Sequence, residues 1–368
     1  MIERLYVNNF RCLQNFELDL RGRSSVLFLG ANGTGKSTVG RVLEILKNIA
    51  SGENRLRTNF DLQDFSNYDR SRSIVIECRL RIDNDLYDYC LNVHWPESFR
   101  EPKVLCESFS FNGEPQFDRD EAQVEIIGGP KFLVDWHNAG LSVIQMKGDS
   151  TPIERLRRFL ASAILLKPQP ATIDSVSDGE ALTPDLDCSN LAHWFSGIIS
   201  EYPAAYGSVQ DYLKQRFEDF SEIQNRTIGE VTKRLLLKFE RDGVGLDLPL
   251  GRLSDGERIQ VIVATLLAVT HYQRPTQCWW DEPENHVGLA ELGIMMTSLR
   301  KAFERDGGQM LVTSHNPEVI RHFSDDNTLL FWRDSHLAPT RTRYVSEIQR
   351  GGDIVESILT RDLVPADG

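Results

Sequence analysis

The chain has 368 residues, of which 40% are hydrophobic and 26% charged, so it is long and apolar enough to bury a large core. Its formal net charge of −13 argues against a general polyanion binder, because nonspecific DNA affinity comes largely from cations that neutralise phosphates; nucleic-acid contact through a local basic face stays open. The longest apolar stretches fall short of the roughly 20 residues that span a bilayer, and the charged N-terminus lacks the apolar core of a signal peptide, so we expect a cytoplasmic protein without a membrane partner.

The first 50 residues contain a phosphate-binding pattern. We expect two strands, and then an apolar run over residues 24–29 that leads into GANGTGKST at residues 30–38. This segment satisfies G-x-x-x-x-G-K-[ST]; an additional glycine lets the loop adopt positive φ angles, and the helix that follows points its positive end at the same anion. Lys36 is expected to neutralise the β and γ phosphates of a nucleoside triphosphate, and the Ser37 hydroxyl to bind magnesium. The predicted nucleotide contacts are Asn32, Gly33, Gly35, Lys36, Ser37 and Thr38.

The middle of the chain predicts strands first and helices afterwards. Residues 73–95 and 104–127 show short alternating runs broken by Asn-Asp, Pro and Asn-Gly, which are typical of antiparallel hairpins. Apolar residues recur at helical spacing over 153–166 and again over 206–239, and the Pro, Ser and Asp-rich stretch 167–190 between them is predicted to be a loop. The six cysteines lie far apart without a C-x-x-C pair, so we interpret them as reduced core residues and not as metal ligands.

A second helix start is predicted in RLSDGERIQ, residues 252–260. Ser254 and Glu257 have the spacing of a capping box, and the simplest interpretation is a well-capped helix. The same helix N-terminus, with the backbone of Asp255 and Gly256, also suits a γ phosphate. Because the phosphate loop already serves the nucleotide within one chain, we expect this second N-terminus to act on a nucleotide held by another chain.

Two short apolar strands in the last third of the chain end in polar side chains. Residues 278–280 run into Asp281 and Glu282, and residues 311–314 lead to His315. Such strand ends are typical of the carboxyl edge of a parallel sheet, where ligands bind. An acidic pair there suits nucleotide hydrolysis, with Asp281 assigned to the metal, through water, and Glu282 to the attacking water.

Taken in this order, GANGTGKST, LSDGE, WWDEPEN and TSH resemble the ABC-type ATPase head of the SMC/RecF/OLD group. The N-terminal stretch ERLYVNNFRCLQNFELDL adds to the resemblance, because a strand carrying Asn-Phe-Arg before a second strand is typical of RecF-like heads and not of transporter subunits. The resemblance implies an α/β fold: a P-loop NTPase ABC-type head with a mixed sheet, an antiparallel first lobe and a helical insert. We expect residues 1–368 to form a single head, divided into a phosphate-loop half with the β lobe (1–150), a helical insert (151–240) and a half with the signature, the acidic strand and the switch histidine (241–368).

In heads of this group two protomers face each other, and each ATP lies between the phosphate loop of one protomer and the signature helix of the other. The resemblance therefore implies ATP and Mg²⁺ as cofactors and a homodimer joined by ATP, with Ser254 and Gly256 touching the nucleotide in trans. His315 resembles the switch histidine that contacts the γ phosphate. Arg11 resembles the early arginine that reaches the nucleotide.

The group also has a glutamine that touches the magnesium and senses the γ phosphate. We assign this role to Gln145, which ends an apolar run, with Gln63 as the alternative. The chain departs from the group in two places: Asp255 stands where many heads have glycine, and residues 286–289 (His-Val-Gly-Leu) stand where relatives often have Leu-His-Pro. A carboxylate near an incoming phosphate lowers affinity in trans unless it points away, so we expect slow hydrolysis.

The length and the sequence pattern of the insert distinguish between the subfamilies of this group. About 100 residues separate Gln145 from Leu253, with several prolines and no sustained heptad pattern, so we expect no long coiled-coil arm. About 50 residues follow His315, and we expect any nuclease activity to come from a separate effector protein. Our preferred hypothesis is an ATP-hydrolysing switch in DNA repair or phage defence. The alternatives are a non-hydrolysing, ATP-bound module that holds or inhibits an effector, a RecF-like DNA clamp and, less favoured, a transporter subunit.

Overall fold

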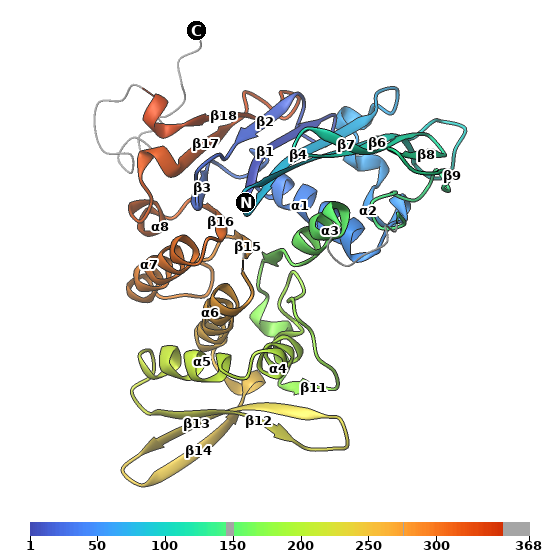
Figure 1. Ribbon diagram of the computed structural model, residues 1–368. Helices are drawn as coiled ribbons and strands as arrows, with labels where there is room; N and C mark the ends of the chain where they lie inside the picture. The colour runs from blue at the N-terminus through green and yellow to red at the C-terminus, as the bar shows by residue number, and fades with distance from the viewer. Residues whose placement is uncertain (145–150, 275, 349–368) are drawn as a thin grey trace. The chain divides into compact units, whose positions relative to one another are not determined.

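The computed structural model describes residues 1–144, 151–274 and 276–348, and Gln145 lies outside the described residues. The chain folds as two compact units (Figure 1). Unit 1 comprises residues 1–163 together with the segment that begins at Asp325, and unit 2 comprises Ile164–Ser324.

Unit 1 contains an antiparallel sheet with the strand order β2-β1-β4-β5-β6-β7-β8-β9 (Figure 1). Buried and more exposed side chains alternate along β4, where Ile74, Ile76, Cys78 and Leu80 are buried, as expected of a strand with one face on the core. The two predicted hairpins are confirmed as the pairs β4–β5 and β6–β7. The strands are β1 (Ile2–Asn8), β2 (Phe16–Asp19), β4 (Ile74–Ile82), β5 (Asp85–His94), β6 (Lys103–Phe111), β7 (Glu114–Asp120), β8 (Gln123–Ile126) and β9 (Lys131–Leu133).

The phosphate loop of unit 1 connects a buried strand to a long helix. All five residues of β3 (Ser25–Leu29) are buried, and β17 (Thr328–Trp332) pairs with it in parallel, followed by antiparallel β18 (Arg341–Tyr344). Helix α1 (Lys36–Ser51) starts inside the predicted loop. The remaining helices of unit 1 are α2 (Leu56–Asn59), α3 (Pro152–Ala161), η1 (Leu62–Asp64), η2 (Ser66–Tyr68), η5 (Asp325–Asn327) and η6 (Val345–Glu347).

Helix α3 packs against α1 and holds the turn between β4 and β5. Its N-cap Thr151 accepts a hydrogen bond from the Glu154 amide, as its position before Pro152 predicts. On the outer side Arg155 reaches two aspartates of the turn, Asp83 at 3.0 Å and Asp85 at 3.1 Å. The arginine is therefore tied to the sheet of its own unit.

The centre of unit 2 is a set of parallel strands with helices. β10 (Ile164–Leu166) pairs with β15 (Gln277–Asp281), which pairs with β16 (Gln309–Ser314). Every residue of β15 and β16 is buried, as expected of parallel strands covered on both faces. The helices here are α6 (Asp255–Tyr272), α7 (Leu289–Arg305) and α8 (Pro317–Arg321).

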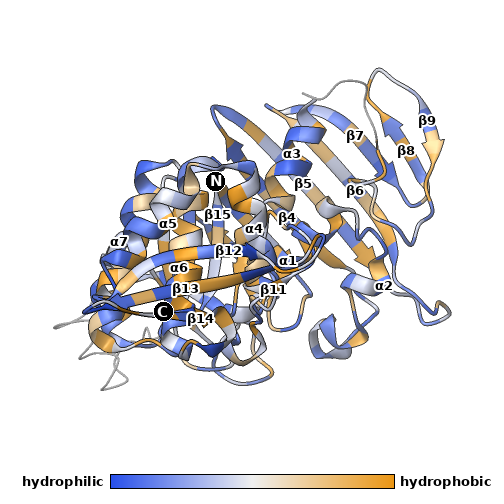
Figure 2. Cartoon of the chain, turned by 90° about the horizontal axis from the view of Figure 1, so that it is seen from below, coloured by the Kyte–Doolittle hydropathy of each residue, from blue (hydrophilic) through white to orange (hydrophobic). Residues whose placement is uncertain are grey.

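Helix α6 is the core helix of unit 2. It packs against α5 and α7, and apolar residues lie on nearly all of its sides, so much of it is orange in Figure 2. A helix that is hydrophobic all round is stable only when it is buried on all sides. The other elements of unit 2 are α4 (Leu191–Glu201), α5 (Ala205–Lys214), η3 (Pro170–Thr172), η4 (Leu250–Arg252), β11 (Val176–Ser177), β12 (Phe220–Thr227), β13 (Lys233–Arg241) and β14 (Val244–Pro249).

The prediction of helix was wrong at two places. Helix extends from Ala205 only to Lys214, and the rest of the predicted stretch forms β12 and β13, which continue through a hairpin into β14. The turn of that hairpin is Asp242-Gly243, with φ of 52° and 78°, and Asp-Gly is a strong signal for a two-residue hairpin turn. Likewise the helix predicted over 153–166 ends at Ala161, and its last three residues form strand β10.

None of the described helices combines the length and the apolar character that crossing a bilayer requires.

Candidate nucleotide-binding and hydrolysis site

The phosphate loop in unit 1 has the backbone that an anion cradle needs. Gly33 and Gly35 have φ of 80° and 101°, a region that favours glycine. Helix α1 begins with Gly35 as its N-cap and without a side-chain cap, which leaves its first turn suited to a phosphate group. The buried Lys36 ammonium donates to the carbonyl oxygens of Gly30 at 2.5 Å and Ala31 at 3.0 Å, so it is held within the loop.

The C-terminal segment of unit 1 braces this loop. The buried Thr340 hydroxyl donates to the Thr34 carbonyl at 2.9 Å, and Arg333 Nη1 donates to the Gly33 carbonyl at 3.1 Å. A Cβ at Gly35 would lie 2.6 Å from Thr340 Oγ1 and 2.9 Å from Cys12 Sγ, so the backbone can pass here only as glycine. Sequence reasoning missed Thr340 and Arg333, because they follow the loop by about 300 residues and carry no motif.

Arg11 precedes Cys12, whose side chain lies beside the same loop, and Arg11 is oriented by a buried carboxylate. Its backbone has φ of 50°, its amide donates to the Asp64 carbonyl at 2.7 Å, and its Nε donates to Asp64 Oδ1 at 2.7 Å. The Asp64 side chain is only 2% exposed, whereas that of Arg11 is 40% exposed. The Sγ of the next residue, Cys12, lies 3.7 Å from Thr38 Oγ1. Gln63 is exposed in η1, next to Asp64.

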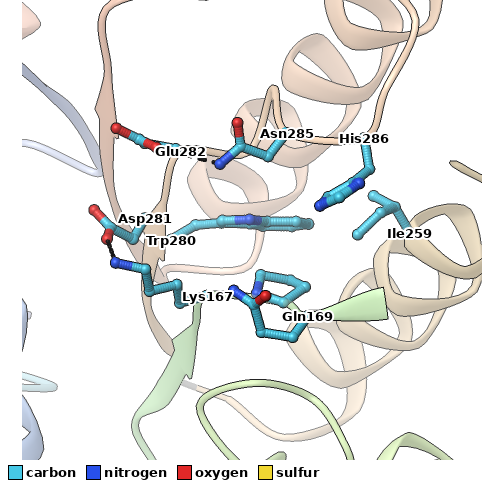
Figure 3. Close-up of a pocket in the computed structure, with 9 residues that line it drawn as sticks. Lys167, Gln169, Ile259, Trp280, Asp281, Glu282, Asn285 and His286 are labelled. Carbon is cyan, nitrogen blue, oxygen red and sulfur yellow. Dashed lines mark hydrogen bonds and ion pairs between the residues drawn. The ribbon is translucent and has the colours of Figure 1, made fainter. Parts of the chain in front are cut away.

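In unit 2, Asp281 ends strand β15 with both carboxylate oxygens in use. The Thr313 hydroxyl donates to Oδ1 at 2.5 Å, and Lys167 Nζ lies 2.9 Å from Oδ2 (Figure 3). The hydrogen bond that Lys167 donates to the Asp281 carboxylate raises the pKa of Lys167. Thr313 is fully buried in the neighbouring strand β16, so one face of the carboxylate is fixed by the sheet.

Glu282 leaves the strand in a constrained conformation. Its φ is 52°, and its amide donates to both the carbonyl and the hydroxyl of Thr313, each at 3.1 Å. Its carboxylate accepts a hydrogen bond from Asn285 Nδ2 at 3.2 Å (Figure 3). The half-exposed His315 Nδ1 lies 3.7 Å from Glu282 Oε1. The structure thus brings Asp281, Glu282 and His315 to one edge of the parallel strands.

Glu284 was missed by the sequence analysis. Its Oε1 accepts from the Ser314 hydroxyl at 2.6 Å and from the His315 amide at 3.4 Å, whereas Oε2 is buried and has no hydrogen-bond partner among the described residues. Burial raises the pKa of this carboxyl group, and the hydrogen bond from Ser314 opposes the shift. Glu284 therefore links the acidic segment to the segment that carries His315.

The signature segment starts α6 as predicted. Ser254 Oγ accepts from the Glu257 amide at 3.3 Å, and Glu257 Oε2 accepts from the Ser254 amide at 2.7 Å, which completes the capping box. Asp255 lies on the other side of the helix start, near Arg258 and His286. A Cβ at Gly256 would lie 3.1 Å from the His286 carbonyl oxygen, so the backbone of the segment after the acidic strand passes close to α6.

A small pocket of unit 2 is lined by residues of the acidic segment, of α6 and of the segment that follows β10 (Figure 3). Trp280 lies between Asn285 and His286 on one side and Gln169 on the other, next to Asp281 with its lysine partner. The pocket is lined by Lys167, Pro168, Gln169, Ile259, Trp280, Asp281, Glu282, Asn285 and His286.

Comparison with known proteins agrees with this fold. Residues 1–175 match the AAA ATPase domain family. The fold is similar to an SMC head bound to the C-winged helix domain of ScpA (13% identity, 94% of this chain and 98% of that chain covered, TM-score 0.58) and to the SMC head domain from Thermotoga maritima (14%, 93% and 98%, 0.51). It is also similar to a Pyrococcus furiosus SMC head domain with an extended coiled coil, bound to the C-terminal domain of ScpA (10%, 98% and 99%, 0.54). A search of curated proteins found no match.

The chain therefore has the α/β P-loop NTPase fold of these SMC heads, with the phosphate loop between β3 and α1. Within this fold class the chain is similar to SMC head domains, and its first 175 residues match the AAA ATPase domain family.

The oxygen donors fit magnesium that is bound together with a nucleotide. Among the described residues, no three His, Cys, Asp or Glu side chains are grouped so that they could hold a metal ion by themselves. Mg²⁺ usually retains water and binds through one or two carboxylates plus the phosphates of its substrate, so it does not need such a group. The Ser37 hydroxyl and the Asp281 carboxylate are oxygen donors of the right kind.

Proposed function

We propose that this chain binds ATP at the Lys36 loop, hydrolyses it with Asp281 and Glu282, and forms an ATP-bridged homodimer that switches a separate effector. The conformation of Glu282 carries the proposal. A non-glycine residue at positive φ is unfavourable and persists only when its surroundings hold it, as the two hydrogen bonds from the Glu282 amide to Thr313 do here. Strain of this kind is typical of sites that must aim a side chain.

In this proposal the Lys36 ammonium exchanges the loop carbonyls for phosphate oxygens, which are stronger acceptors because they are charged. Glu282 orients the attacking water and takes its proton, since a carboxylate is the base available at this strand end. His315 donates a hydrogen bond to the γ phosphate. Mg²⁺, held by Ser37 and Asp281, would supply neutralising charge to the phosphates.

The dimer would use the start of α6 as its second phosphate site. The Ser254 oxygen accepts from the Glu257 amide, so its hydroxyl proton is available for a phosphate oxygen of the partner's nucleotide. Asp255 is drawn toward Arg258 and His286, which reduces its repulsion of that phosphate. Ser254 and Gly256 are therefore the proposed trans contacts.

The effector is proposed to be a protein. Two of the similar SMC heads are bound to a domain of ScpA, which supports the idea that a head of this fold has a protein partner. We place the switch in DNA repair or phage defence by analogy with RecF-like heads.

The test combines solution mass and turnover. We expect the mass of Glu282→Gln to double with ATP and magnesium, measured by light scattering behind a sizing column, and its turnover to fall at least about 100-fold below that of the unchanged chain. Lys36→Ala should stay monomeric, and Glu304→Gln, an exposed glutamate of α7, should behave like the unchanged chain. An unchanged mass would refute the ATP-driven dimer. Bound nucleotide without turnover in the unchanged chain would instead favour the non-hydrolysing module.

A further inference from the structure

Strand register, and not a sequence motif, places Lys167 beside the acidic pair. Strand β10 pairs in parallel with β15, with Leu166 opposite Trp280. The residues that follow this pair are Lys167 and Asp281, so both side chains lie at the carboxyl edge of the same strands. The Lys167 side chain is 53% exposed, whereas that of Asp281 is 6% exposed, so the lysine approaches from the solvent side.

The contact lies on the oxygen of Asp281 that faces away from the sheet support. Thr313, fully buried in β16, donates to Oδ1, and Lys167 Nζ lies at Oδ2, 2.9 Å away. An ammonium group and a magnesium ion both seek this carboxylate. The Lys167 ammonium group and the magnesium ion therefore compete for the same Asp281 oxygen.

The negative charge around Asp281 also favours the contact with Lys167. Asp281, Glu282 and Glu284 place three carboxyl groups within four residues. In a chain without metal, the lysine supplies positive charge close to this group. Its long flexible stem lets it withdraw into solvent when another cation arrives.

We propose that Lys167 is a positioning residue that occupies Asp281 Oδ2 in the metal-free chain and must leave it when magnesium binds with the nucleotide. This inference rests on the proposed function, because it assumes that Asp281 serves the metal. Breaking the Lys167–Asp281 contact would add a free-energy cost to metal binding, and the sequence motifs do not predict this cost. Nucleotide loading is then coupled to release of the Lys167–Asp281 contact.

The test is the magnesium dependence of nucleotide affinity. A fluorescent, non-hydrolysable ATP analogue is titrated into the full chain with magnesium and with EDTA. The ratio of the Kd in EDTA to the Kd in magnesium measures the contribution of the metal to nucleotide affinity. We expect Lys167→Met to raise this ratio about two- to fivefold, the size of effect that a partly exposed ion pair supports, with a lower Kd in magnesium. Lys167→Arg, which keeps the charge, should retain the original ratio.

Lys233→Met is the matched control, because Lys233 also makes a 2.9 Å ion pair in unit 2, with Glu180. Its ratio should equal that of the unchanged chain. A Lys167→Met ratio equal to or below that of the unchanged chain would overturn the inference while leaving the proposed function intact. If the unchanged chain bound no analogue in either condition, the proposed function itself would fail.

Discussion

Asp255 and His286 lie together, with 3.4 Å between Asp255 Oδ2 and His286 Nδ1. These are the two places at which the sequence departs from the pattern of SMC/RecF/OLD heads. Arg258, one turn into α6, places its guanidinium Nη1 3.6 Å from Asp255 Oδ1. The two departures therefore offset each other: a carboxylate added to the signature segment meets an imidazole from the segment after the acidic strand.

The first prediction concerns this carboxylate. Asp255→Asn keeps the shape and removes the charge, so a phosphate arriving in trans should meet less repulsion. We expect the ATP-dependent dimer to form at roughly threefold lower protein concentration, measured by light scattering on the Glu282→Gln background. The loss of an acidic group from the first turn of α6 should lower the melting temperature by no more than about 2 °C.

Asp247→Asn on strand β14 serves as the control, because Asp247 also pairs with an arginine on the surface of unit 2. Its dimerisation should match that of the background protein. Weaker dimerisation of Asp255→Asn than of the control would show that Asp255 contributes to the interface instead of opposing it.

The second prediction concerns Asp64, which touches Arg11 but has no assigned contact with nucleotide. Asp64→Asn removes the charge that holds Arg11 Nε, and Arg11 then loses its orientation. We expect nucleotide Kd to rise about three- to tenfold in a fluorescence titration. Asp61→Asn, which alters the other acid of the same short helix start, should leave Kd unchanged. An unchanged Kd in Asp64→Asn would mean that Arg11 does not depend on this carboxylate.

The fold was predictable wherever a local pattern determined it. The loop glycines, the alternating runs of the β lobe and the capping box at Ser254 each follow from a few neighbouring residues, and the structure confirms these elements. The helix predicted over 206–239 was wrong beyond Lys214. The segment also has the alternation of a strand, because Leu235, Leu237 and Phe239 are buried in turn, and the Asp-Gly turn that follows favours a hairpin.

The supporting residues of the site could not be predicted in the same way. Thr340 and Lys167 reach the loop and the acidic pair through strand pairing between segments far apart in sequence, and no local pattern encodes such pairing. Glu284 stood within a quoted motif, but only its buried position reveals its link to His315. The motif residues were found from the sequence, and their catalytic roles stay predictions.

The third prediction tests the brace of the phosphate loop. Thr340→Val keeps the volume of the side chain and removes the hydroxyl, which leaves the Thr34 carbonyl without this donor. Losing such a buried hydrogen bond costs about 1–2 kcal/mol, part of which should appear as a looser loop. We expect nucleotide Kd to rise several-fold and the melting temperature to fall by about 2–4 °C. Thr340→Ser, which keeps the donor, should restore the affinity; if both variants bound nucleotide equally well, the hydroxyl would not be the brace.

The last prediction follows from the raised pKa of Glu284. A carboxyl group with a higher pKa in the folded chain holds its proton more tightly there than in the unfolded chain. Between the two pKa values the folded state binds more protons, so stability falls as pH rises above the unfolded value of 4.5 and levels off once the folded group has ionised. Glu284→Gln keeps an acceptor for the Ser314 hydroxyl and removes this penalty.

The melting temperature of Glu284→Gln minus that of the unchanged chain should therefore increase from pH 5 to pH 8. We expect this difference to grow by about 2–4 °C if the penalty is on the order of 1 kcal/mol. Glu291→Gln, in the exposed first turn of α7, is the control and should show no such trend. A difference in melting temperature that stays constant with pH would mean that Glu284 ionises alike in both states. The buried Oε2, for which the described part of the chain provides no donor, would then have to be satisfied in another way, because an ionised oxygen without a donor is costly to bury.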